Sequence, residues 1–380
     1  MDFPVELITQ SQQLNNAVQE MAESRTLAVD TEANSRYRYP EQLCLIQIAT
    51  PNKIFIIDTI LLKEINSLKN IFLDASILKV FHTADYDILS LHRHFGFQIH
   101  SVYDVALAAR FTGVSKFALV TLLKDILGIT IEKNRRIQEG DWGRRPLSKE
   151  ALGYAAYDVR YLLALRDVLD KRLRELRRTD WVIEECKRLE ELRYEPRDEE
   201  TAFFSIKGAS RLDGRSLAIL KSLFQFREQE AIRQNRPPYF VIPHSTLLYL
   251  AANPDADLSK TSGLGQTGLK RFGHGLQRAL NRGLTSPPIQ RERKEISEIE
   301  KAQLILINEQ KDERLKHLKA WRESIGNMLS LDQSLIWPRE SLERLALEPD
   351  TLEIELKSSD VRLWQRDHFS SYLTVLLASL

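Results

Sequence analysis

Two carboxylates, Asp30 and Glu32, follow the apolar residues 27–29 directly, in the stretch "LAVDTE". If this stretch is a strand, residues two apart point to the same face, so the two acids lie side by side. Like charges held that close raise each other's pKa or require a positive partner. The alternative is that the strand has already ended and both acids face water.

A second group of candidate residues lies further along the chain. Asp87 follows the β-rich run "ILKVFH" at the start of a helical pattern, and Tyr154 and Asp158 are four residues apart within another helix. The spacing of four places the phenol and the carboxylate on one helix face. Taken alone, Asp158 could instead pair with Arg160 or Arg144.

Together, the four acids would concentrate negative charge inside one domain. Mg²⁺ and Mn²⁺ are the hard cations that prefer carboxylate oxygens. Two such ions about 3.5–4 Å apart are a standard arrangement for in-line displacement at phosphorus. The set predicts a site for two divalent cations, Mg²⁺ or Mn²⁺, held by Asp30, Glu32, Asp87 and Asp158.

The elements that must position these residues follow from the hydrophobic pattern. The first half of the chain alternates short β-rich runs with helical patterns, which indicates an α/β domain. Pro51 and Asn52 suit a hairpin turn between two of the strands. We predict strands over 26–32, 43–50, 53–60 and 77–82, helices over 61–73 and 86–95, the second ended by Gly96, and a long helix from an N-cap at Ser148 through 178.

The second half of the chain is helical and contains a weak repeat. The charged stretch "YEPRDEE" at 194–200 and the Pro-bearing stretch "LTSPPIQRERKE" at 284–295 both indicate linkers. The segments that follow them show the same order of helices over roughly 85–95 residues, as in a duplicated domain. The predicted domains are 1–195, 208–286 and 296–380.

Composition limits the classes of protein to consider. A chain of 380 residues exceeds one ordinary core, and 43% hydrophobic with 28% charged residues describes a soluble globular protein. The net charge of +1 gives no global argument for nucleic-acid binding. Cys44 and Cys186 show no metal-like spacing, and no run is long enough to span a membrane. The start of the chain is unlike a signal peptide, so we expect a cytoplasmic protein without a membrane partner.

Three short motifs in order resemble those of ribonuclease D, a member of the superfamily of 3′→5′ exonucleases with four acidic residues. They are "VDTE", "HTADYDILSL" and the tyrosine-bearing "YAAYD", and "DWGRRPLS" resembles the stretch before the third motif. The two helical segments resemble HRDC domains, the second being more diverged. The resemblance implies a ribonuclease H-like mixed sheet flanked by helices, followed by two all-α HRDC-like domains.

The resemblance also implies an activity. It predicts an exoribonuclease that releases nucleoside 5′-monophosphates from 3′ ends, with tRNA precursors and other structured RNAs as substrates. Tyr154 would then orient the attacking water. Two alternatives are a 3′→5′ DNA exonuclease and a catalytically silent RNA-binding scaffold. No obligate protein partner is evident.

The sequence suggests further contacts with RNA. Gln47, on the strand after the first motif, could reach substrate, and Trp142 could stack on the terminal nucleotide or simply pack. Residues 258–291 lack Asp and Glu. In that stretch Lys270, Arg271 and Arg278 could contact phosphates, and its glycines could let backbone approach them. The alternative is a helical connection whose glycines serve turns and whose charges are solvated.

Three polar residues near the motifs are expected to have structural roles. We predict that Asp85 caps the start of the helix that bears Asp87. His82 and Asp104 are expected to brace the fold or cap a helix rather than to bind metal.

Overall fold

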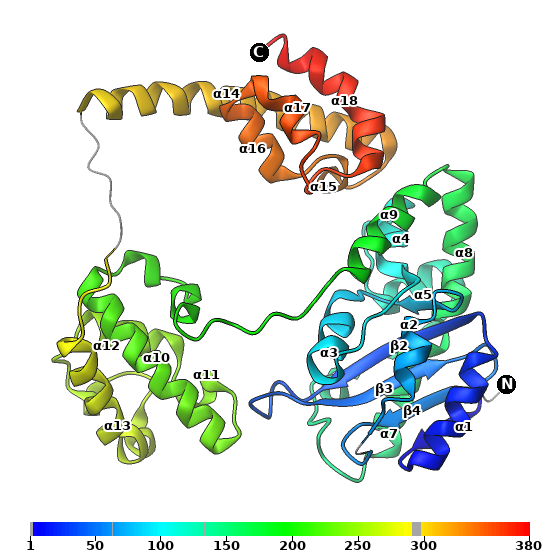
Figure 1. The fold of residues 1–380 in the computed structure, drawn as a ribbon, viewed down its shortest axis with the longest axis horizontal. Helices are drawn as coiled ribbons and strands as arrows, with labels where there is room; N and C mark the ends of the chain where they lie inside the picture. Colours follow the sequence, from blue (N-terminus) through cyan, green and yellow to red (C-terminus); the bar gives the residue numbers. More distant parts are fainter. Residues whose placement is uncertain (1–2, 63, 133, 291–297) are drawn as a thin grey trace.

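A computed structural model describes residues 3–62, 64–132, 134–290 and 298–380 (Figure 1). Along the chain an α/β part comes first, then a first helical group (α10–α13, residues 214–285) and a second helical group (α14–α18, residues 298–377). This order agrees with the arrangement predicted from the sequence.

The α/β part is built on a six-stranded mixed sheet with the strand order β1-β4-β3-β2-β5-β6. The three strands β2, β3 and β4 are antiparallel, and the other pairs are parallel. The Thr50 amide donates to the Lys53 carbonyl at 2.9 Å, which closes the predicted hairpin between β3 and β4. The strands are β1 (Val5–Ile8), β2 (Thr26–Ala33), β3 (Leu43–Ala49), β4 (Ile54–Asp58), β5 (Leu78–Phe81) and β6 (Val102–Asp104).

Helices cover both faces of this sheet. Leu27 and Val29 of β2 point into the core formed with α1, α2 and α3, whereas Ala28 points into the core formed with α4, α5, α7, α8 and α9. Because side chains alternate along a strand, Asp30 and Glu32 share the face of Ala28. The helices are α1 (Ser11–Ala22), α2 (Leu68–Leu73), α3 (Asp85–Phe95), α4 (Val105–Phe111), α5 (Leu119–Leu127), α6 (Arg135–Gln138), α7 (Lys149–Arg160), α8 (Leu162–Glu175) and α9 (Thr179–Glu190).

The predicted helix from Ser148 to 178 is two helices. Ser148 caps α7 as expected, its side chain accepting from the Ala151 amide at 3.1 Å. The helix then stops at Tyr161, whose φ of −110° and ψ of 0° lie outside helical geometry, and α8 continues from Leu162. Gly96 ends α3 in the left-handed conformation, as predicted. The predicted helix over 61–73 forms only from Leu68, and the sequence did not predict the strands β1 and β6 or the helices α1, α4, α5, α6 and α9.

The two helical groups show the same order of elements. Each begins with a long helix, continues through a four-residue helix and a helix whose N-cap is proline (Pro243 and Pro338), and ends with a long helix. Residues 291–297, which include part of the second predicted linker, lie outside the described residues. The helices are α10 (Gly214–Gln234), α11 (Pro238–Val241), α12 (His244–Ala252), α13 (Gly265–Thr285), α14 (Glu298–Leu329), α15 (Gln333–Ile336), α16 (Arg339–Leu347), α17 (Leu352–Glu355) and α18 (Leu363–Leu377).

Two glycines of α13 allow this helix to lie against α10. A Cβ added at Gly275 would lie 2.3 Å from the Phe226 ring, and one at Gly283 would lie 2.5 Å from the Ile219 Cα atom. Both glycines therefore serve helix packing and not an approach to phosphate, which corrects that expectation for these two positions.

The second helical group packs directly on α9. The ring of Trp364 stacks on that of Trp181 with centroids 4.6 Å apart and an interplanar angle of 18°. Arg362 forms an ion pair with Glu185 at 2.9 Å, and Arg178 donates to the Leu329 carbonyl at 2.7 Å. One hydrophobic core therefore runs from the sheet into the C-terminal helices.

In the part of the chain that the structure describes, each helix is too short or too polar to cross a membrane.

Candidate active site

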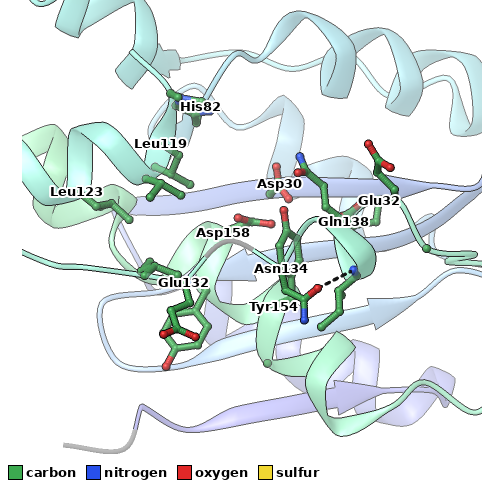
Figure 2. Close-up of a pocket in the computed structure, with 18 of the residues that line it drawn as sticks. Asp30, Glu32, His82, Leu119, Leu123, Glu132, Asn134, Gln138, Tyr154 and Asp158 are labelled. Atoms are coloured by element: carbon green, nitrogen blue, oxygen red, sulfur yellow. Dashed lines mark hydrogen bonds between the residues drawn. The ribbon is translucent and has the colours of Figure 1, made fainter. Parts of the chain in front are cut away.

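Strand β2 and helix α7 bring three of the predicted carboxylates together. One oxygen from each of Asp30, Glu32 and Asp158 lies within 4.8 Å of the other two. Figure 2 shows these side chains, with Tyr154, around one cavity. Three carboxylates at such distances repel one another strongly unless a cation or protons neutralise them.

Asp87, the fourth predicted acid, lies beside this trio and is not part of it. Its side chain is 5% exposed at the start of α3, and its carboxylate accepts a hydrogen bond from the Thr31 hydroxyl at 2.5 Å. Burial raises the pKa of Asp87 well above its usual value, and the nearby negative charge of Asp30 raises it further.

Burial and mutual repulsion dominate the electrostatics of the site. Burial raises the pKa of Asp30 to about 7. The pKa of Glu32 is raised well above its usual value, first by burial and then by the charges of Asp30, Asp158 and Asp87. A set of converging oxygen ligands that is costly to ionise without a cation fits a hard divalent metal.

Gln47 places a second buried polar group without a partner next to the acids. It lies opposite Asp30 in the antiparallel pair of β2 and β3, and its side chain is completely buried. Neither its amide nitrogen nor its amide oxygen has a hydrogen-bond partner among the described residues. Complete burial also means that Gln47 cannot contact RNA, which corrects the expectation from the sequence.

The variant Gln47→Met is expected to melt at or above the temperature of the wild type without metal. An unsatisfied buried amide costs about 1–3 kcal/mol, and an apolar side chain of similar shape removes this cost. Thermal unfolding followed by circular dichroism measures the change. A loss of more than about 1 kcal/mol would instead indicate that the amide has a polar partner in solution.

Tyr154 lines the cavity one helical turn before Asp158. Burial raises the pKa of its phenol, and the charges of Asp158, Glu32 and Asp30 raise it further. Tyr154 therefore stays a neutral hydrogen-bond donor near neutral pH. The ring of Trp142 lies behind that of Tyr154, with centroids 6.0 Å apart.

Trp142 itself is a packing residue. Its side chain is 3% exposed, and the indole N–H donates to the Gln138 carbonyl at 3.4 Å. The expected stacking of Trp142 on a terminal nucleotide is therefore wrong, and the alternative of a buried packing role is confirmed. Its neighbour Asp141 accepts from the Gly143 amide at 3.0 Å, which shapes the loop before α7.

The cavity above the acids has a volume of about 1170 Å³. Its second wall comes from α5 and from residues within 129–132 and 134–140, for which the sequence predicted no function. Figure 2 shows Leu119, Leu123, Asn134 and Gln138 of this wall. The apolar spacing of α5 was a visible signal, but it equally describes a helix that only packs on the core.

The structural role of Asp104 is confirmed, the role predicted for Asp85 is wrong, and His82 also lines the cavity. The Asp104 carboxylate accepts from the Thr83 and Ala84 amides at 3.2 and 2.9 Å, and it also caps α4. The start of α3 is thus held by Asp104, and no side chain caps it locally. His82 contacts the Phe117 carbonyl through Nε2 at 2.8 Å.

Arg145 fixes the loop before α7 to the sheet. Its guanidinium contacts the buried Asp58 carboxylate at 2.6 and 2.8 Å and donates to the Trp142 carbonyl at 2.6 Å. This loop leads into the helix that carries Tyr154 and Asp158, so the ion pair helps to position these two residues.

The two cysteines, Cys44 and Cys186, are free and buried.

The three basic residues predicted to contact RNA are exposed on α13 of the first helical group, far along the chain from the acids. They are Lys270, Arg271 and Arg278. Phe272, which lies between them in the sequence, is 6% exposed and belongs to the core of that group.

Comparison with known proteins agrees with this arrangement. The family described as 3'-5' exonuclease matches residues 5–174, and the HRDC domain family matches residues 216–280. One HRDC domain is thus identified, and the second that we predicted is not. Among solved structures, the chain resembles RNase D of Escherichia coli, with a TM-score of 0.74, 22% identity and coverage of 100% of this chain and 99% of that chain. It also resembles the catalytic core of RRP6 from Trypanosoma brucei, with a TM-score of 0.65, 24% identity and coverage of 74% and 80%. At these identities the likeness concerns the fold.

Two relatives found by sequence share a higher sequence identity with the chain than these two solved structures do. The ribonuclease D of Sphingobium indicum is 34% identical over 271 residues, which cover 69% of this chain and 68% of the relative. The ribonuclease D of Desulfotalea psychrophila is 29% identical over 314 residues, which cover 80% and 83%. The acidic trio lies within the matched exonuclease region, and the chain belongs to the ribonuclease D family.

Proposed function

We propose that this chain is a metal-dependent 3′→5′ exoribonuclease that releases nucleoside 5′-monophosphates. The observation that carries the proposal is the group of three carboxylates from β2 and α7 within 4.8 Å of one another, beside a cavity of about 1170 Å³. The names of its relatives support RNA as the polymer.

Each residue of the site has a role in this proposal. Asp30, Glu32, Asp87 and Asp158 hold two divalent cations, Mg²⁺ or Mn²⁺, which when bound supply Lewis-acid activation of water and neutralise charge on the phosphate. Tyr154, kept neutral by burial and by its acidic neighbours, donates a hydrogen bond that orients the attacking water. Leu119, on the opposite wall, offers an apolar surface to the terminal base.

The 3′ ends of structured RNAs, tRNA precursors among them, are the proposed substrates. The solved E. coli RNase D is described as an exoribonuclease involved in structured RNA processing, and its fold covers the whole of this chain. Lys270, Arg271 and Arg278 supply an exposed basic surface for the body of such an RNA.

Three labelled substrates test the proposal. The purified chain is incubated with a tRNA precursor, single-stranded RNA and single-stranded DNA, each labelled at the 3′ end, with Mg²⁺ or Mn²⁺ and with or without a chelator. We expect chelator-sensitive release of labelled mononucleotide from RNA. Preferential release from DNA would favour a DNA exonuclease, and retardation without cleavage would favour a scaffold.

We further propose that the chain has three domains at 1–195, 208–286 and 296–380, of which the third is a diverged HRDC-like domain. The shared order of helices and the proline N-caps at Pro243 and Pro338 support this duplication. The packing of Trp364 on Trp181 suits a third domain that is a fixed part of the nuclease.

A further inference from the structure

Two segments that are rich in arginine and aromatic residues meet near the cavity, although they lie about two hundred residues apart in the sequence. Residues 35–39, "SRYRY", connect β2 to β3. Residues 236–240, "RPPYF", connect α10 to α11 and form most of α11. Neither 33–40 nor 231–254 contains an acidic residue.

Tyr39 joins the two segments. Its backbone amide donates to the Asn235 side-chain oxygen at 3.2 Å, and its hydroxyl donates to Glu228 at 2.5 Å. In Figure 1 the connection between β2 and β3 extends toward α11. Glu228 is already paired with Arg227 at 2.8 Å, so its charge is largely neutralised at this contact.

On the side of the α/β part, this connection forms part of the rim of the cavity. Arg36 lines the cavity, and its guanidinium, on a side chain that is 60% exposed, lies 3.1 Å from Glu139. The Tyr37 hydroxyl donates to the Glu139 carbonyl at 2.9 Å, which holds the connection against the rim. Arg38 is exposed. Three residues span at most about 10 Å, so Tyr39 lies close to the cavity mouth.

On the side of the helical group, two large rings face solvent. Tyr239 and Phe240 are 49% and 53% exposed, with ring centroids 4.5 Å apart, and the Arg236 guanidinium lies 5.1 Å from the Phe240 centroid. Exposed rings beside a guanidinium provide base stacking and phosphate attraction with little dependence on sequence.

We propose that Arg36, Tyr37 and Arg38, together with Arg236, Tyr239 and Phe240, form a track for single-stranded RNA. The track holds the nucleotides upstream of the 3′ end that lies in the cavity: the arginines contact phosphates and the rings of Tyr239 and Phe240 stack on bases. The inference rests on the proposed function, because the strand would enter the cavity that Arg36 and the acids both line. It concerns a different surface from the basic residues of α13. Glu139 pairs with Arg36 at the rim, but the two segments that form the track carry arginines and no acid of their own, which favours a polyanion over a protein partner.

The double variant Tyr239→Ala/Phe240→Ala tests the track through its dependence on RNA length. For an oligomer of about 16 nucleotides we expect KM to rise about tenfold or more with kcat unchanged, since each stacked base contributes appreciably to binding. For a trinucleotide, whose nucleotides would lie mainly in the cavity of about 1170 Å³, kcat/KM should stay within about twofold of the wild type. Arg38→Glu should weaken binding of the long RNA and reduce the salt dependence of that binding by about one unit of slope.

The matched control is Tyr372→Ala, which removes an aromatic residue that is 54% exposed on α18. It should leave KM unchanged for both lengths, and all variants should melt as the wild type does. Fluorescence anisotropy with long RNA in chelator measures binding without cleavage. If the double variant binds the long RNA as tightly as the wild type, the proposal of an RNA track is wrong. The exposed rings of Tyr239 and Phe240 would then suit a protein partner instead. If the wild type binds RNA but cleaves none, the proposed function fails, and the anisotropy comparison still decides on the track.

Discussion

The variant Asp30→Asn is expected to lose at least about three orders of magnitude in kcat and at the same time to become more stable than the wild type in the absence of metal. The loss of activity follows because the amide keeps the shape of the side chain but removes one negative oxygen ligand from the trio with Glu32 and Asp158. The gain in stability follows because the same carboxylate is buried among like charges.

The sign and the pH window of the stability change follow from the pKa of Asp30. In the folded chain this pKa is raised from 3.8 to about 7. Between these values the folded state holds a proton that the unfolded state has released, so the contribution of Asp30 to stability falls as the pH rises. Because one pKa unit corresponds to about 1.4 kcal/mol, the gain from Asp30→Asn at pH 7 is of the order of 2 to 4 kcal/mol and disappears below about pH 4.

Chemical denaturation of wild type and variant at about pH 4 and pH 7, in chelator, measures this difference. Asp85→Asn is the matched control, since Asp85 is an exposed acid two residues before Asp87 and outside the trio. Its activity should stay within about twofold of the wild type, with a change in stability of at most about 1 kcal/mol. An Asp30→Asn protein that is destabilised at pH 7, or that retains full activity, would contradict the proposed acidic site.

The variant Trp364→Ala is expected to lower the free energy of unfolding by about 3 to 5 kcal/mol. Trp364 is 4% exposed and stacks on Trp181, and its ring also meets the edges of Phe111 and Phe369. Its indole N–H donates to Glu185 at 3.3 Å. Truncation to alanine therefore leaves a cavity in the core shared by the sheet and the C-terminal helices.

Leu363→Ala is the matched control for Trp364, because the neighbouring side chain is 60% exposed and its backbone amide keeps the bond to Glu184. Differential scanning calorimetry should show a large fall in Tm for Trp364→Ala and a small one for Leu363→Ala. Limited proteolysis should also cut Trp364→Ala near the start of the second helical group before the α/β part. Equal stability of the two variants would mean that the C-terminal helices do not share a core with α9.

Local rules were sufficient for the residues that act within one element. Side chains alternate along β2, so Asp30 and Glu32 lie on one face of the strand. The spacing of four places Tyr154 and Asp158 on one face of α7. Each rule uses only residues that are close together in the sequence, so the sequence was sufficient for both. The hairpin at Pro51 and the helix end at Gly96 were predictable for the same reason. The family motifs added the expected order of the domains.

Only the tertiary structure decided which predicted residues reach the cavity. Gln47 lies on the strand after the first motif and Trp142 in the stretch before the third, yet both side chains are buried beneath α7 and the loop before it. Asp87 is held by Thr31 at the edge of the trio. The wall from α5, the bracing of α3 by Asp104 and the packing of Trp364 on Trp181 all join residues far apart in sequence. Such contacts depend on how whole elements bury their apolar faces against one another. Hydrophobic burial is non-directional and acts between residues at any separation in the sequence, so a local sequence pattern does not specify which elements will meet.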